Sequence, residues 1–372
     1  SPKYNKCSAD SLYTFTFPHT LKTTLPSVTF NDQIIASQRI NANFTNYSTF
    51  TQASLTGYNG SFTYAIMSVT CDGVSISAGS DGSYGAIGGI SASLGVSTTK
   101  NTSAPSGLYV LTVKATTSSL STNISATATL TLRIHPQYYY VNCDLNGGTW
   151  SNSSFTGGRY SWSSSSDKTV DVGLVKFTGY TFMGWEIVTN TTDGTATLGS
   201  PTSSFYSAEI TIPAGAYGDI YIKAKWSKTV KFYTYTSDTT AATYTEVSFE
   251  YIDGFVTITG ITMPTISGLT KVGWTTSVSM HTSSNYILAE GETVRSDTTT
   301  KKYADAYYAV YRSSSQYTVK FNGNTATSGS MSDLSGYIYY SVSPQNYNKG
   351  WHYKTGIDLG NNKFSKTGYT FA

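Results

Sequence analysis

The chain has 372 residues, a net charge of +3, and only 12% charged residues. So small and dispersed a charge excludes the basic excess of a typical nucleic-acid binder, and 39% hydrophobic residues argue against disorder. No apolar run is as long as the roughly 18 residues of a membrane-spanning helix. Frequent Thr, Tyr and Val with Gly between segments favour an all-β to β-rich fold.

The first 136 residues predict a β-sandwich. In Ser125–Ile134, apolar and polar residues alternate strictly, which is typical of a strand with one buried face. Tyr109–Ala115 predicts the preceding strand, and the polar residues between the two are suited to a hairpin connection. Pro136 cannot donate a hydrogen bond to a sheet, so we place a domain boundary there.

Two Asp-Gly pairs in this region, Asp72-Gly73 and Asp81-Gly82, raise the question of a calcium site. A calcium loop needs several oxygen ligands at fixed spacing, and the Asp-x-Asp strings that supply them are missing. Asp-Gly is also a common turn sequence. We therefore expect turns, and metal ligation is the alternative.

The three cysteines, Cys7, Cys71 and Cys143, are an odd number, so at most one disulfide forms within the chain. Cys7 and Cys71 are the favoured pair because both fall in the first expected domain. Three buried free thiols are the alternative. Heavy use of Ser, Thr and Tyr at low charge resembles extracellular surface proteins more than cytosolic enzymes.

Seven Asn-x-Ser/Thr sequons all lie before residue 193. A sequence this rich in Ser and Thr produces several sequons by chance, so their number is weak evidence for glycosylation. In a secreted protein whose host glycosylates, they are expected on exposed loops or strand faces. The sequons begin at Asn43, Asn46, Asn59, Asn101, Asn123, Asn152 and Asn190.

From residue 138 onward the sequence repeats itself. Val141, Val230 and Val319 each begin a similar strand, and the interval is 89 residues in both cases. Trp185 and Trp274, which close two similar segments, are also 89 residues apart. Two independent landmarks at one spacing indicate an internal repeat.

Each of the first two repeats ends on an alternating strand, Ile220–Trp226 in one and Tyr307–Tyr311 in the other. The third repeat reaches Ala372 without a Gly-Trp pair or a closing strand. An unpaired sheet edge is a liability, so we expect the natural product to be longer. The alternative is that a neighbouring subunit supplies the missing strand.

These segments resemble the Listeria–Bacteroides repeat, also called the internalin-type B repeat. The resemblance rests on Asn146-Gly147-Gly148, on Phe177–Trp185 with its Gly-Tyr-Thr-Phe-x-Gly-Trp string, and on Ala224-Lys225-Trp226. It covers residues 138–372 and implies β-grasp-like modules in tandem on prokaryotic surface proteins. The second repeat departs from the pattern at Leu269-Thr270-Lys271, so its core must be repacked.

The first domain is similar, over its last two strands only, to Ig-like and cadherin-like modules of secreted prokaryotic proteins. The expected organisation is therefore an Ig-like β-sandwich followed by β-grasp-like repeats. The domains are residues 1–136, repeat 1 at 137–228, repeat 2 at 229–316, and an incomplete repeat 3 at 317–372.

Nothing in the sequence points to an enzyme. A glycosidase needs two carboxylates about 5–10 Å apart in a cleft. The pairs Asp167/Asp171 and Glu246/Glu250 are spaced to lie on one face of a strand, where solvated charge is the expected role. The four histidines are far apart in the sequence, and none of the common metal, thiol or nucleophile motifs is present. We expect no cofactor.

Several aromatic residues exceed what a core needs and are candidates for an interface with other copies, other surface proteins or glycans. Trp185, Trp226 and Trp274 lie at repeat landmarks, which favours core packing for them. The interface candidates lie in variable segments or in Tyr-rich strands: Tyr138, Tyr139, Tyr140, Trp150, Trp162, Tyr339, Tyr340 and Trp351.

The sequence thus predicts a secreted structural protein of a prokaryotic cell surface, acting as a fibre, array or stalk subunit through repeat packing. The alternative is an adhesin that binds carbohydrate or a receptor. A shallow groove formed by Trp150, Trp162 or Trp351 would favour that alternative.

Overall fold

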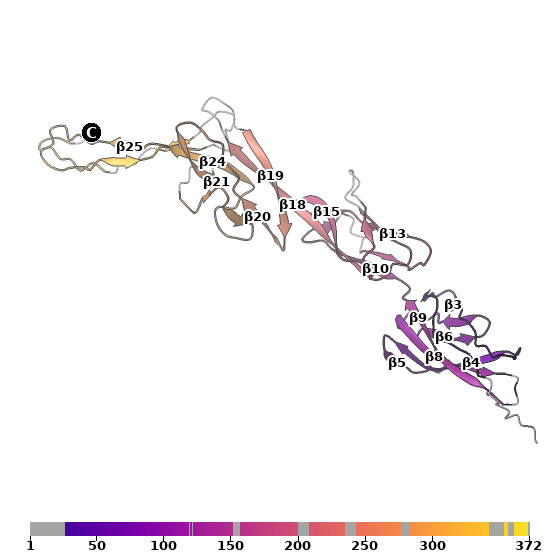
Figure 1. The fold of residues 1–372 in the computed structure, drawn as a ribbon. Helices are drawn as coiled ribbons and strands as arrows, with labels where there is room; N and C mark the ends of the chain where they lie inside the picture. Colours follow the sequence, from indigo (N-terminus) through magenta and orange to yellow (C-terminus); the bar gives the residue numbers. More distant parts are fainter. Residues whose placement is uncertain are drawn as a thin grey trace, which may run out of the picture. The chain divides into compact units, whose positions relative to one another are not determined.

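The computed structural model of the chain contains strands and no helix among the residues that it describes (Figure 1), which confirms the all-β to β-rich expectation. Contacts between residues divide the chain into two compact units, residues 1–137 and 138–372. Within the described part, no helix is long and apolar enough to cross a membrane. The described residues are 27–118, 120, 122–151, 157–199, 208–234, 243–276, 283–341, 353–355 and 361–370.

The first unit is built on a sheet in the order β1-β9-β8-β4-β5, with β2 also paired to β9. Its central pair, β8 and β9, is antiparallel over its whole length, as the alternating sequence predicts. Every second residue of β9 from Ala128 to Ile134 is buried. The strands are β1 (Gln33–Ile34), β2 (Gln38–Arg39), β4 (Phe62–Cys71), β5 (Val74–Ile76), β8 (Gly107–Thr117) and β9 (Ser125–His135).

A smaller sheet, β3-β7-β6, contributes to the same core. Ile87 and Val96 of this sheet are fully buried in one cluster with Leu111 and Leu130 of the larger sheet. Tyr109 joins the two, because its hydroxyl accepts a hydrogen bond from the N–H of Ala86 at 3.0 Å. The strands are β3 (Tyr47–Ser48), β6 (Ile87–Ser91) and β7 (Gly95–Thr98).

Both Asp-Gly pairs of the first unit lie in turns. Asp72 and Gly73 have φ angles of 48° and 81°, which suits a two-residue hairpin between β4 and β5. The Asp72 carboxylate accepts a hydrogen bond from the Leu108 N–H at 2.9 Å. Asp81 accepts from both the N–H and the hydroxyl of Ser83. In each carboxylate, one oxygen therefore accepts hydrogen bonds from Leu108 or from Ser83.

In the second unit, repeat 1 forms a sheet in which β10 pairs with β12 and β18, and β15 pairs with the other edge of β18. Smaller sheets, β13-β17-β16 and β11-β14, belong to the same repeat. The strands are β10 (Tyr139–Asp144), β11 (Thr149–Trp150), β12 (Gly158–Tyr160), β13 (Lys168–Val172), β14 (Val175–Lys176), β15 (Thr181–Thr189), β16 (Thr197–Leu198), β17 (Ala208–Ile212) and β18 (Ile220–Thr234).

Repeat 2 has equivalent pairings. β19 and β24 pair with the second half of β18, and β21 pairs with β24. Both repeats have a β-bulge just before the Gly-Trp pair, at Met183 and at Val272. Gly184 and Gly273 follow these bulges with φ angles of 121° and 144°. The strands are β19 (Thr243–Ile252), β20 (Phe255–Thr259), β21 (Leu269–Thr275), β22 (Ile287–Leu288), β23 (Thr293–Arg295) and β24 (Ala306–Ser313).

The start of repeat 3 is similar to that of repeat 1. Asn324 has a φ of 43° and its N–H bonds to the Asn322 side chain, just as Asn146, with a φ of 48°, bonds to Asp144. One of its strands, β27, adds to the edge of β24 in repeat 2. The strands of this repeat are β25 (Tyr317–Val319), β26 (Leu334–Gly336), β27 (Tyr339–Ser341) and β28 (Tyr353–Thr355).

Candidate functional site at the junction between repeats

Repeats 1 and 2 are joined by a strand, not by a linker. The 15 residues of β18 form the closing strand of repeat 1 in their first half and the opening strand of repeat 2 in their second half. Figure 1 shows β18 beside β15 of repeat 1 and β19 of repeat 2. Buried and more exposed side chains alternate from Ile220 to Trp226 and again from Val230 to Thr234. Trp226 of the first core lies four positions before Val230 of the second.

The next junction is built differently. Ala224 and Ala309 have equivalent partners, Trp185 and Trp274, yet they are only 85 residues apart, against 89 for the other landmarks. Repeat 2 therefore has four more residues than repeat 1 between its closing strand and the next opening strand. As a consequence, β24 ends at Ser313 and β25 starts separately at Tyr317.

Aromatic side chains from both repeats meet at the first junction. Phe177 and Tyr180 of repeat 1 stack with their ring centroids 4.1 Å apart. Tyr251 of repeat 2 packs edge-on against both, at 5.3 and 5.2 Å. Such edge-to-face pairs are favourable beyond the area that they bury. We call Phe177, Tyr180 and Tyr251 the junction cluster, and it makes each repeat part of the packing of the other.

A charged side chain lies on the core side of β18 between the two hydrophobic clusters. The Lys228 ammonium is 3.0 Å from the Asp305 carboxylate, and it lies 5.2 Å from the centre of the Tyr180 ring. The Lys228 side chain is only 14% exposed. Burial acts to lower the pKa of Lys228, but the hydrogen bond and charge of Asp305 outweigh it and raise that pKa. Lys228 is therefore charged and ties repeat 1 to the start of β24.

The outer face of the same strands carries a ladder of opposite charges. Lysines on β18 pair with acids on β19 or in the turn after it: Lys231 with Glu246 at 3.4 Å, Lys225 with Glu250 at 3.1 Å, and Lys223 with Asp253 at 3.7 Å. These pairs are largely exposed, so each contributes little to stability. Glu246 and Glu250 thus lie on a solvated face, where they have lysine partners.

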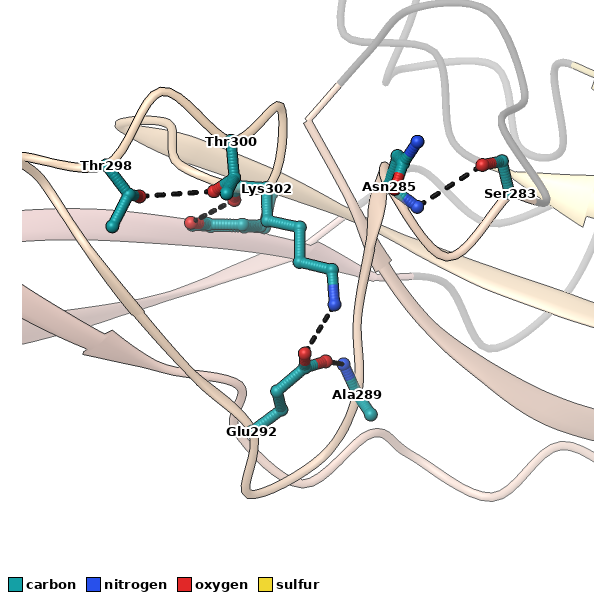
Figure 2. Close-up of polar contacts among 8 residues, drawn as sticks. Ser283, Asn285, Ala289, Glu292, Thr298, Thr300 and Lys302 are labelled. Atoms are coloured by element: carbon teal, nitrogen blue, oxygen red, sulfur yellow. Dashed lines mark hydrogen bonds and ion pairs between the residues drawn. The ribbon is translucent and has the colours of Figure 1, made fainter.

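Two further glutamates hold a loop of repeat 2. Figure 2 shows Glu292 between the Lys302 ammonium and the backbone N–H of Ala289. Both contacts lower the pKa of Glu292. Glu290 likewise accepts the N–H of Met263 and pairs with Lys271 at 3.2 Å, and its pKa is lowered. These carboxylates are occupied in fixing the chain between β22 and β23.

Three of the expected interface residues lie at the start of repeat 1. Tyr139 packs on Tyr160 with centroids 5.6 Å apart, and Tyr138 lies under the Arg159 guanidinium at 4.2 Å. Tyr140 is 50% exposed. In repeat 3, Tyr339 and Tyr340 pair with Arg312 and Tyr311 of β24, so they belong to the junction between repeats 2 and 3.

Two of the tryptophans proposed for an adhesin groove, Trp150 and Trp162, are partly buried. Trp150 packs on Trp185 with centroids 6.1 Å apart and belongs to the edge of the repeat 1 core. The Trp162 indole N–H donates to the Gly215 carbonyl at 3.1 Å. Trp351 lies outside the described residues. Trp150 and Trp162 are thus both held by contacts within repeat 1.

The sequons differ in accessibility. Asn46 donates its amide to the Arg39 carbonyl, and Asn190 donates to the carbonyls of Gly194 and Ala196. Asn152 lies outside the described residues. The exposed asparagines are Asn43, Asn59, Asn101 and Asn123.

The cysteine pairing stays open, because Cys7 lies outside the described residues. Among the described residues, Cys71, which is buried in the first unit, and Cys143 of repeat 1 form no disulfide. Burial raises the pKa of Cys143 to about 12 and also raises that of Cys71. Both are therefore poor nucleophiles at neutral pH.

The described residues bring together no set of catalytic groups. Asp167 accepts the N–H of Ala214 at 2.9 Å, and Asp171 lies on the exposed side of β13. His135 is buried, and burial followed by the nearby Arg133 lowers its pKa to about 3. Within the described residues, no three His, Cys, Asp or Glu side chains are grouped to hold a metal ion. The other three histidines lie outside these residues.

No model of a known protein family matches the sequence, and no curated protein matches it. The resemblance to the Listeria–Bacteroides repeat therefore stays a prediction from the residues alone.

Proposed function

We propose that the chain is an extracellular structural protein of a prokaryotic cell surface, acting as a fibre, array or stalk subunit through the packing of its repeats. The observation that carries this proposal is the shared strand β18. It joins two repeats without a flexible linker, and the junction cluster packs across it. A chain of directly joined modules is suited to holding a fixed spacing.

The finer assignments belong to the same proposal. The first unit is Ig-like, and the repeats are β-grasp-like modules of the Listeria–Bacteroides type. Its partners are further copies of the chain or other surface proteins. Tyr140, which is 50% exposed, is a side chain available for such contacts.

Immunogold electron microscopy of cells that produce the protein tests this proposal. Gold label on extracellular filaments, lattices or stalks is the expected result, and the labelled structures separate fibre from array and stalk. Label confined to the cell interior contradicts the proposal. Label spread over the surface with no visible structure, together with binding on a glycan array, supports the adhesin instead.

A further inference from the structure

The opening and closing strands of each repeat are parallel neighbours. β10 pairs with the first half of β18 from Val141↔Ile220 to Asp144↔Lys223. The second half of β18 pairs with β24 from Lys231↔Ala306 to Tyr233↔Tyr308. Because the two strands of each pair run in the same direction, the chain enters a repeat at one end of the pair and leaves it at the other.

This arrangement decides how tension along the chain reaches the sheet. Pulling the start of one strand and the end of its parallel neighbour slides the strands past each other, so all hydrogen bonds of the pair carry load together. In an antiparallel hairpin the two free ends lie side by side, and the bonds open one after another. Several backbone hydrogen bonds that must break together give a far higher barrier than the same bonds broken singly.

We propose that the pairs β10–β18 and β18–β24 are two mechanical clamps in series, which give repeats 1 and 2 a force-bearing function. The clamps share one strand, so tension passes from the first to the second within β18 itself. One face of these pairs is buried, through Val141, Ile220 and Ile222 in the first and Phe232 and Tyr307 in the second. On that face the core shields the bonds that carry load from water.

The junction cluster and the Lys228–Asp305 ion pair strengthen the connection. Tyr251 of repeat 2 pairs with Trp226 in the backbone register and packs on Phe177 of repeat 1. Repeat 2 therefore also contacts the half of β18 that belongs to repeat 1. The Lys228 ammonium lies 3.0 Å from the carboxylate of Asp305, the residue that precedes β24. The second junction has separate strands, and we assign no clamp there.

Optical tweezers on the full chain test the clamps. Attachment handles at Gln137 and Gln316 leave the first unit out of the force path and load both pairs in shear. The expected record is two extensions of about 300 Å each, since a repeat of 89 residues unfolds to that length. The control places the second handle at Ala214, an exposed residue just before β18. Pulling there opens the β10–β18 pair from one end.

At a fixed force, repeat 1 is expected to survive at least about tenfold longer between Gln137 and Gln316 than between Gln137 and Ala214. A handle at Thr192, whose N–H bonds to the Tyr217 carbonyl at the same end of the sheet, repeats the control independently. Equal lifetimes in all three geometries overturn the proposal. Urea unfolding of each handle variant without force verifies that the fold is intact.

This inference deepens the structural role proposed above, but the two fail separately. If the lifetimes are equal but gold label lies on surface structures, the clamp proposal is wrong and the structural role stands. If repeat 1 survives longer in the shear geometry but the label lies inside the cell, the clamp proposal stands and the extracellular assignment is wrong.

Discussion

Repeats 1 and 2 share their strand pairings but place their aromatic side chains at different positions. In repeat 1, Phe182 on β15 pairs with Trp226, and their ring centroids are 5.1 Å apart. In repeat 2 the equivalent pair is Lys271 and Tyr311, and Lys271 turns to the Glu290 carboxylate. The large side chain that occupies this position in repeat 1 is therefore missing from repeat 2.

The loss is compensated at the neighbouring parallel pair. Repeat 1 has Cys143 opposite Ile222, whereas repeat 2 has Phe232 opposite Tyr307. Phe232 stacks on Tyr307 at 5.1 Å and meets Trp274 edge-on at 4.9 Å. Cores tolerate many changes if their total volume is kept. In repeat 2 the large aromatic side chains thus lie at the parallel pair, whereas in repeat 1 they lie at the pair between β15 and β18.

Exchange of Phe182 on β15 for its repeat 2 equivalent is expected to have the largest effect on the free energy of unfolding. Phe182→Lys places a charge beside Trp185 and Trp226 and should cost about 4 kcal/mol of unfolding free energy. The reverse change, Lys271→Phe, should cost less than about 1.5 kcal/mol, because Lys271 is partly exposed. Urea unfolding followed by Trp fluorescence measures both. Equal costs would show that the two positions are interchangeable and would contradict the comparison.

Changes at the pair Phe232 and Tyr307 are expected to have the next largest effect on the free energy of unfolding. Phe232→Cys, which introduces the residue of repeat 1, should cost about 3 kcal/mol, because Phe232 is fully buried. Adding Tyr307→Ile should cost less than its own single effect, since the stacking partner has already gone. A double-mutant cycle on the urea curves measures this coupling. Strict additivity would mean that the two side chains fill separate spaces.

The two landmark tryptophans differ in their hydrogen bonds. The Trp274 indole N–H donates to the Ile261 carbonyl at 2.8 Å, whereas the buried N–H of Trp185 meets no acceptor among the described residues. Trp274→Phe should therefore cost about 1 kcal/mol more than Trp185→Phe, because it leaves a carbonyl unpaired. The two unfolding midpoints provide the measurement. A larger cost at Trp185 would point to an acceptor for its N–H.

At alkaline pH, the two repeats should differ in the pH at which they begin to lose stability. This effect is expected to be smaller than those above. Burial raises the pKa of Cys143 in repeat 1 from 9.0 to about 12, and that of Tyr308 in repeat 2 from 10.0 to about 12. Each group stabilises fully below its unfolded pKa, and this stability is lost as pH rises towards the folded value. Repeat 1 should thus begin to lose stability near pH 9. Cys143→Ala should shift that onset upward, as pH-dependent urea midpoints will show.

The sequence predicted a large part of this architecture. Alternation located the main pair of the first unit, and the 89-residue spacing located equivalent strands in the repeats. It also predicted that repeat 2 is repacked around Lys271. The compensation by Phe232 and Tyr307 was not predictable, because it depends on the register of a parallel pair between strands 75 residues apart.

The shared strand was missed for a local reason. The expected boundary between repeats 1 and 2 follows Lys228, which lies in the middle of β18. Lys228 breaks the apolar alternation, and a charged residue at an inward position suggests a loop. The structure holds it there by the ion pair to Asp305, which no pattern near Lys228 reveals. The lack of Gly and Pro between Ile220 and Thr234 was the available signal for a single strand.

The shared strand also has a consequence for synthesis and for the evolution of the repeat array. Once repeat 1 has folded, the second half of β18 is held extended and serves as a template for the strands that follow it. Folding can therefore proceed in the order in which the chain is made. A gene rearrangement that removed one repeat would have to join two halves of different strands in register, because a slip of one residue turns every side chain to the opposite face.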